Sequence, residues 1–187
     1  MANAATEGLR YQPRPRPGWV RGANAMGRAI DAKSVVLLDE KSLLETAMAN
    51  TGLSDFGDDD WREPFRILLD DLERHAALHL VGRLMTRSDL LVHLEGRLRV
   101  VDWLKRHPEI ERQRIEAPVF VVGLPRSGTT IMEEILGADP NARSVRMWEA
   151  KLPVPPPRPD DPKPDPRIAR AEALVGLQDA ITPEWAT

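Results

Sequence analysis

The sequence predicts an α/β fold in which a P-loop-type strand, loop and helix follow a helical N-terminal section and begin an incomplete parallel sheet. Three observations predict it: residues 119–122 form an apolar run, residues 123–128 carry glycine at both ends, and apolar residues recur at helical spacing through 38–108. A chain of 187 residues with 42% hydrophobic content can bury an ordinary core. We expect three regions: a disordered Arg/Pro-rich arm over 1–30, the helical section 38–108, and the truncated start of the α/β domain over 117–187.

Composition excludes several classes of protein. The formal net charge of −3 gives no general attraction to nucleic acid. The absence of cysteine removes disulfides, thiolate metal ligands and cysteine nucleophiles, and it fits the cytoplasm. No window approaches the roughly 18 consecutive apolar residues of a membrane span. The sequence therefore predicts a cytoplasmic protein with neither a nucleic-acid partner nor a membrane span.

The first two helices of the central section have recognisable ends. Residues 39–49 are amphipathic and are followed by Gly52, a typical helix stop. Asp60 and Glu63 have the spacing of a capping box, which favours the start of a second helix that runs to near Gly82. A metal site at Asp58 to Asp60 is the less favoured alternative.

A third helix is predicted from after Ser88 to His107. His75 and His79 share the i, i+4 spacing of a helical metal pair, but no third ligand accompanies them. We therefore expect ordinary helix-surface histidines and no metal. The N-terminal arm is either a mobile tail or a segment lying across a partner subunit.

Past the glycine-bearing loop, the pattern predicts one strand–helix–strand unit. A helix over 129–137 ends at Gly-Ala-Asp-Pro, and residues 144–147 form a second short strand. Residues 152–166 contain eight prolines and cannot join a helix or a sheet interior, whereas 168–180 again has a helical pattern. Trp148 and Glu149 either help to position a ligand beside the sheet or have structural roles, the tryptophan covering the loop and the glutamate pairing with an arginine.

The loop over 123–130 has the chemistry of an anion cradle. Gly123 and Gly128 let the backbone approach a ligand, and the amides after Arg126 open a helix whose N-terminus carries about half a positive charge. Thr129 stands where an NTP-binding loop has its lysine, which disfavours a nucleotide kinase or GTPase. A sulfuryl group carries a single formal negative charge, so its transfer can rely on Arg126 and hydrogen-bond donors without a metal.

At these residues the sequence resembles the sulfotransferase family, in the bacterial branch whose loop reads Gly-Leu-Pro-Arg-Ser-Gly-Thr-Thr. The resemblance extends over most of residues 38–180 and covers the N-terminal part of such proteins only. The other matching segments are residues 53–57, 138–140, 148–149 and 165–167.

The resemblance implies a co-substrate, 3′-phosphoadenosine 5′-phosphosulfate, and transfer of its sulfuryl group to a hydroxyl or amine of a small-molecule acceptor. It implies no metal. Arg126 would act as the catalytic cation on the leaving phosphate. The donor-binding residues would be Arg126, Ser127, Gly128, Thr129 and Thr130.

The sequence also departs from the family. No histidine follows Thr130 that could serve as the family's general base, and no later Arg…Ser segment binds the nucleotide 3′-phosphate. We therefore expect a truncated chain, inactive by itself, with an apolar face left for a homo-oligomeric partner or a missing C-terminal half to cover. The alternatives are a non-enzymatic helical interaction module and an inactive gene fragment.

Overall fold

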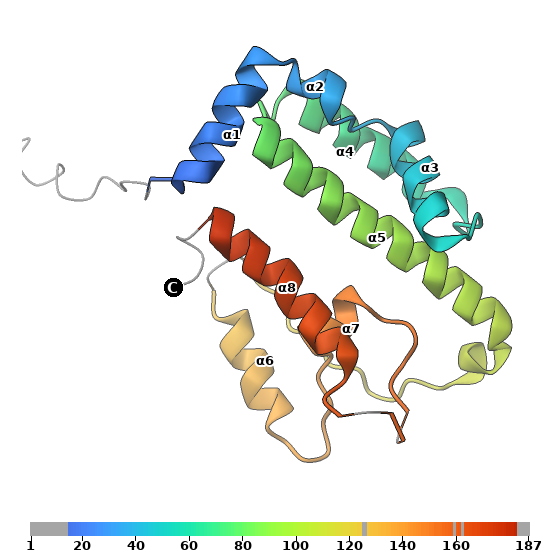
Figure 1. Cartoon of the computed structure of the whole chain (residues 1–187). Helices are drawn as coiled ribbons and strands as arrows, with labels where there is room; N and C mark the ends of the chain where they lie inside the picture. The colour runs from blue at the N-terminus through green and yellow to red at the C-terminus, as the bar shows by residue number, and fades with distance from the viewer. Residues whose placement is uncertain (1–14, 125–126, 159, 162, 183–187) are drawn as a thin grey trace, which may run out of the picture.

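The computed structural model describes residues 15–124, 127–158, 160–161 and 163–182, and its regular elements are all helical (Figure 1). Two short 3₁₀ helices, η2 (Asp59–Trp61) and η3 (Pro108–Arg112), flank the central pair of α-helices. The α-helices in chain order are α1 (Gly18–Ala29), α2 (Ala32–Val35), α3 (Glu40–Thr51), α4 (Arg62–Arg74), α5 (Leu80–Arg106), α6 (Thr129–Gly137), α7 (Met147–Lys151) and α8 (Pro166–Ile181).

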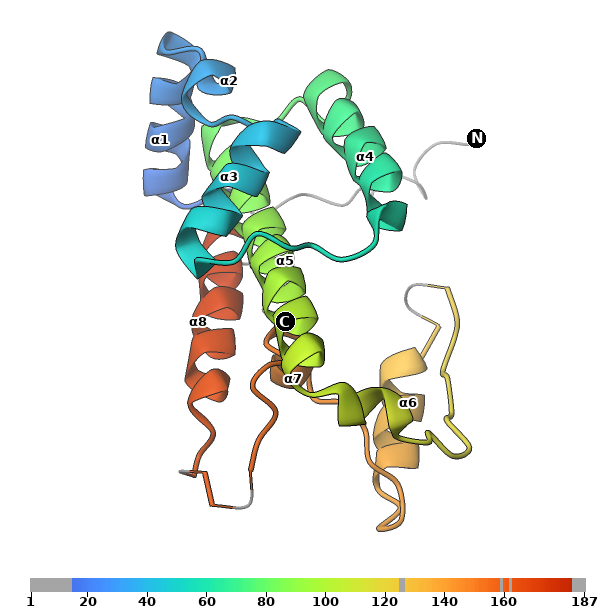
Figure 2. The ribbon, with the colours of Figure 1, turned by 90° about the vertical axis from the view of Figure 1, so that its right-hand side faces the viewer.

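Helix α5 is the spine of the molecule. Its 27 residues span about 40 Å at 1.5 Å per residue. Figure 1 shows it running diagonally, with α1 to α4 along one side and α7 and α8 along the other. In the view turned by 90°, α6 stands at the opposite edge of the molecule from α8 (Figure 2).

The main core lies where α3 and α4 pack against α5. Leucine, alanine and phenylalanine side chains fill it, because α3 to α5 each turn an apolar stripe inward. Trp61 extends this core, with its ring 5.5 Å from that of Phe56 and 5.6 Å from that of Phe65. The buried members are Leu43, Ala47, Phe56, Phe65, Leu69, Leu94 and Leu98.

Residues 18–29 are helical, so the expectation of a disordered arm over 1–30 is wrong for that part, while residues 1–14 lie outside the described residues. Val20 is buried, and a Cβ on Gly27 would lie 2.4 Å from the Cβ of Leu80. The Asn24 side chain accepts a 3.0 Å hydrogen bond from the Val81 amide at the start of α5. This close tertiary contact orders a segment whose local composition disfavours helix.

The first predicted helix is confirmed and the next boundary is wrong. Helix α3 begins after Asp39, whose side chain accepts from the Ser42 amide, and ends at Gly52 in the left-handed region. The predicted second helix instead ends at Arg74, and α5 runs unbroken through Gly82 and Ser88. Apolar periodicity did not reveal the break between α4 and α5. Both helices place apolar residues against the same core, so the apolar pattern continues from one helix into the next.

The capping box predicted at Asp60 is also wrong, since α4 follows a 3₁₀ turn and no side chain caps it. His75 ends α4 and His79 precedes α5, so the two histidines do not share a helix face. Within the described residues no group of three or more acidic or histidine side chains could hold a metal ion.

The sheet is absent from the described residues, so the prediction of an incomplete parallel sheet is not met. Residues 118–122 are without regular structure, and Phe120 and Val122 are 82% and 90% exposed. A β-strand needs a neighbouring strand to pair its backbone groups and help cover its side chains, and no described residue supplies one. The uncovered sheet edge stays a prediction, although apolar side chains of this segment and of α6, among them Ile131 and Ile135, are exposed.

The C-terminal elements are helical and pack on one another and on α5. Residues 144–146 are not a strand, and α7 begins at Met147, which corrects the second strand predicted at 144–147. The helix predicted over 168–180 is confirmed as α8, which packs on α7. Among the helices that the structure describes, none is long and apolar enough to cross a membrane.

Candidate anion-binding site

The loop before α6 folds back on itself at Gly123. A Cβ at this position would lie 2.5 Å from Ser127 Oγ and 2.9 Å from Thr129 Cγ2, distances that real Cβ atoms do not tolerate. The Ser127 amide donates a 3.1 Å hydrogen bond to the Leu124 carbonyl. The glycine therefore leaves room for the Ser127 and Thr129 side chains, which would have to rotate or shift to admit a larger residue.

Gly128 joins this turn to α6. Its φ of 92° lies in the left-handed region, which glycine adopts without strain. Its carbonyl accepts the Met132 amide at 3.0 Å, the first bond of the helix. No described side chain caps the helix, so the amides of its first turn lack intrahelical acceptors. These amides carry the partial positive charge of the helix N-terminus, which favours binding of an anion.

The described site residues lie together and face water. Ser127, Gly128 and Thr130 are exposed and Thr129 is half-buried, with its Cγ2 methyl group beside Gly123. Arg126, the predicted catalytic cation, lies outside the described residues, as does Pro125. The structure thus brings Gly123, Ser127 and Thr129 into one turn. The position of the Arg126 guanidinium stays a prediction.

Trp148 and Glu149 engage arginines. Glu149 forms an ion pair with Arg143 and accepts the Arg146 amide at 2.9 Å, which is the structural role anticipated for this glutamate. The Arg167 guanidinium lies 4.7 Å from the centre of the Trp148 ring, a cation–π distance.

Arg167 is a contact that sequence reasoning missed. It donates 2.9 Å to the Leu152 carbonyl and pairs with Asp165 at 2.8 Å. Its hydrogen bonds hold the pKa of the Asp165 carboxyl below its ordinary value of 3.8. The Asp-Pro-Arg segment gives a sequence signal only for the helix start, because Asp165 is the N-cap of α8 and Pro166 its first residue. The other two partners of Arg167, the Leu152 carbonyl and the Trp148 ring, lie 15 or more residues earlier in the sequence and carry no local pattern.

Comparison with known proteins finds similarity to sulfotransferases. A family model described as "Sulfotransferase family" matches residues 118–185. Two solved structures are similar in fold and sequence: sulfotransferase STF1 from Mycobacterium tuberculosis H37Rv, with a TM-score of 0.67 and 35% identity, and sulfotransferase STF9 from Mycobacterium avium, with 0.66 and 31%. Each similarity covers 78% of this chain, and the chain spans 40% and 38% of the two solved chains. Among curated proteins none matches the chain.

Proposed function

Because the chain belongs to the sulfotransferase family, we propose that its 123–130 loop binds the phosphosulfate end of 3′-phosphoadenosine 5′-phosphosulfate for sulfuryl transfer to a hydroxyl or amine. One observation carries the proposal. The turn closed at Gly123 delivers an exposed, uncapped helix N-terminus, which is the arrangement an oxyanion needs. The chain covers about two fifths of its solved relatives, so turnover and acceptor are proposed on the family relationship alone.

In this proposal the residues of the loop have different roles in binding the donor. Amides of Gly128, Thr129 and Thr130 donate to the non-bridging oxygens, and the hydroxyls of Ser127 and Thr130 add further donors. The Arg126 guanidinium, a permanent cation, neutralises charge that develops on the phosphate oxygen as its bond to sulfur breaks. The bound donor supplies the activated sulfuryl group, and these side chains orient it for in-line attack.

Binding of adenosine 3′,5′-bisphosphate to the full chain, measured by calorimetry, tests the proposal. We expect saturable binding that Arg126→Ala weakens by about tenfold or more, since a charge-assisted contact contributes about 1.5–3 kcal/mol. Arg28→Ala, at an exposed position of α1, is the matched control and should leave binding unchanged. Equal binding by the two variants would remove Arg126 from the site.

A second test uses the geometry of the turn. Gly123→Ala forces Ser127 and Thr129 apart and should weaken bisphosphate binding, whereas Gly176→Ala meets nothing within 4 Å and should not. If the chain bound no bisphosphate while folding as a helical protein, donor binding by this loop would be excluded.

A non-enzymatic interaction module is the second candidate function. The exposed apolar surface around Phe120, Val122 and Ile131 favours it, because such a surface commonly marks a site of association. It predicts a partner whose binding is indifferent to adenosine 3′,5′-bisphosphate. A cytoplasmic location stays a prediction for either function.

A further inference from the structure

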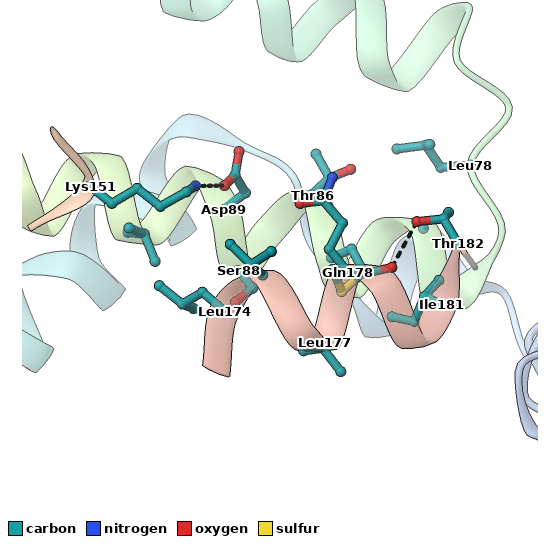
Figure 3. A pocket seen from close by; sticks show the side chains of 14 residues that line it. Leu78, Thr86, Ser88, Asp89, Lys151, Leu174, Leu177, Gln178, Ile181 and Thr182 are labelled. Atoms are coloured by element: carbon teal, nitrogen blue, oxygen red, sulfur yellow. Dashed lines mark hydrogen bonds and ion pairs between the residues drawn. The ribbon is translucent and has the colours of Figure 1, made fainter. Parts of the chain in front are cut away.

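A pocket of about 480 Å³ lies between α5 and α8 (Figure 3). Lining side chains come from both helices and from Lys151 at the end of α7. The volume falls within the roughly 300–1,000 Å³ of small-molecule sites. None of the lining residues belongs to the proposed donor site, so the pocket is a separate feature, named here the α5–α8 pocket.

The two long walls of the pocket are apolar. Met85 and Val92 stand two turns apart on α5, and Leu174, Leu177 and Ile181 follow one face of α8. From Gly82 to Val92 the α5 wall extends about 15 Å at 1.5 Å per residue. Leu177 remains 47% exposed, so the neighbouring helix does not fill the space. An elongated apolar ligand fits these walls.

One end of the pocket is polar in a specific way. Figure 3 shows Asp89 and Lys151 facing each other at the end opposite Leu78 and Thr182. Lys151 Nζ lies 3.9 Å from Asp89 Oδ1, which is beyond the roughly 2.7–3.2 Å of a hydrogen bond. The Thr182 hydroxyl at the far end already donates 2.7 Å to the Gln178 carbonyl. The Lys151 ammonium and the Asp89 carboxylate, whose Oδ2 also lies 3.7 Å from His93 Nε2, keep hydrogen-bonding capacity for a ligand at their end of the pocket.

This pair selects the charge of a ligand's head group. A hydroxyl can accept from Lys151 while it donates to Asp89, whereas a carboxylate would face Asp89 and an ammonium would face Lys151. We propose that the α5–α8 pocket binds a neutral, elongated apolar alcohol, with its chain between the two helices and its hydroxyl bridging Asp89 and Lys151. The proposal is independent of donor binding by the loop.

Calorimetric titration of the full chain with decanol, decanoate and decylamine tests the head-group preference. We expect saturable binding of decanol at one site and at least about tenfold weaker binding of the two charged probes. In the double variant Asp89→Ala with Lys151→Ala, the three affinities should converge. Equal affinities in the unsubstituted chain would overturn the proposal.

Two matched substitutions test the location. Leu177→Glu places a charge in the pocket wall and should abolish decanol binding, whereas Leu84→Glu, at a position of α5 that is 50% exposed and outside the pocket, should not. Helical circular dichroism should be retained by both variants because both positions are open to water. Undiminished binding by Leu177→Glu overturns the proposal, and so does a dimer of the unsubstituted chain, detected by sedimentation, that Leu177→Glu dissociates.

Discussion

Arg83 of α5 forms an ion pair with Glu73 near the end of α4, and its guanidinium also donates to the Val36 carbonyl at 2.7 and 3.0 Å. The arginine is 1% exposed and is the one charged side chain among the buried residues that the structure describes. One guanidinium thus ties α5 to two other segments, because its hydrogen bonds reach Val36 after α2 and Glu73 at the end of α4.

Arg83→Met should destabilise the protein by about 3 kcal/mol, the lower end of the cost of removing one partner from a buried pair, since Glu73 keeps some access to water. Urea unfolding followed by circular dichroism measures the change. Arg74→Met is the control: its pair with Asp70 at 2.7 Å is exposed, so the loss should stay below about 1 kcal/mol. Equal effects of the two substitutions would contradict a buried anchor at Arg83.

Stability should depend on the charge of Glu73. Hydrogen bonding by Arg83 lowers the pKa of this carboxyl from its ordinary 4.5. A carboxyl with a lowered folded-state pKa stabilises the fold above its unfolded-state value and loses that contribution as pH falls through the lowered pKa. The difference in unfolding free energy between the unsubstituted chain and Glu73→Gln should therefore be largest at neutral pH and shrink below about 4.5. In an Arg83→Met background this pH dependence should become smaller but persist, because Lys33 still lies 3.3 Å from the Glu73 carboxylate.

The crossing of α1 over the start of α5 requires glycine at position 27. Gly27→Ala would place a Cβ 2.4 Å from that of Leu80, so we expect a loss of about 1–3 kcal/mol from overpacking. Gly22→Ala lies in the same helix with nothing within 4 Å, and should stabilise by about 0.5–1 kcal/mol. Thermal unfolding of the two variants should give shifts of opposite sign, and a stabilising Gly27→Ala would exclude the close crossing.

Two phenylalanines should respond oppositely to truncation. Phe120 is 82% exposed, so Phe120→Ala should leave stability within about 0.5 kcal/mol and reduce the fluorescence of an apolar-surface dye. Phe65 belongs to the core, so Phe65→Ala should cost about 3–5 kcal/mol. Loss of stability in Phe120→Ala would show that the 118–122 segment is covered in solution.

The sequence predicted the elements whose ends are set by nearby residues. Asp39 and Gly52 bound α3, and Gly128 precedes α6, because caps and left-handed glycines act within one turn. Elements set by distant contacts were missed. Helix α1 depends on packing against α5, and the 118–122 segment needs neighbouring strands that the described residues do not supply.

The candidate site was likewise predictable only in part from the sequence. Glycine spacing located the turn at Gly123 and the open start of α6, whereas Arg126 stays a prediction along with its catalytic role. The α5–α8 pocket had no sequence signal, since its walls come from segments more than 70 residues apart and consist of ordinary helix-facing apolar residues. The division into a helical section and a donor-binding region likewise stays a prediction.

The hydrogen bond from the Val81 amide to Asn24 has a consequence for the order of folding. The longest helix of the protein has its first turn held by a residue 57 positions earlier in the chain, so that turn is completed only when a long loop has closed. The middle of α5, which meets α3 through closer sequence neighbours, can assemble before this happens. The hydrogen bond that caps the first turn of α5 therefore forms only when α1 has come back to meet this helix.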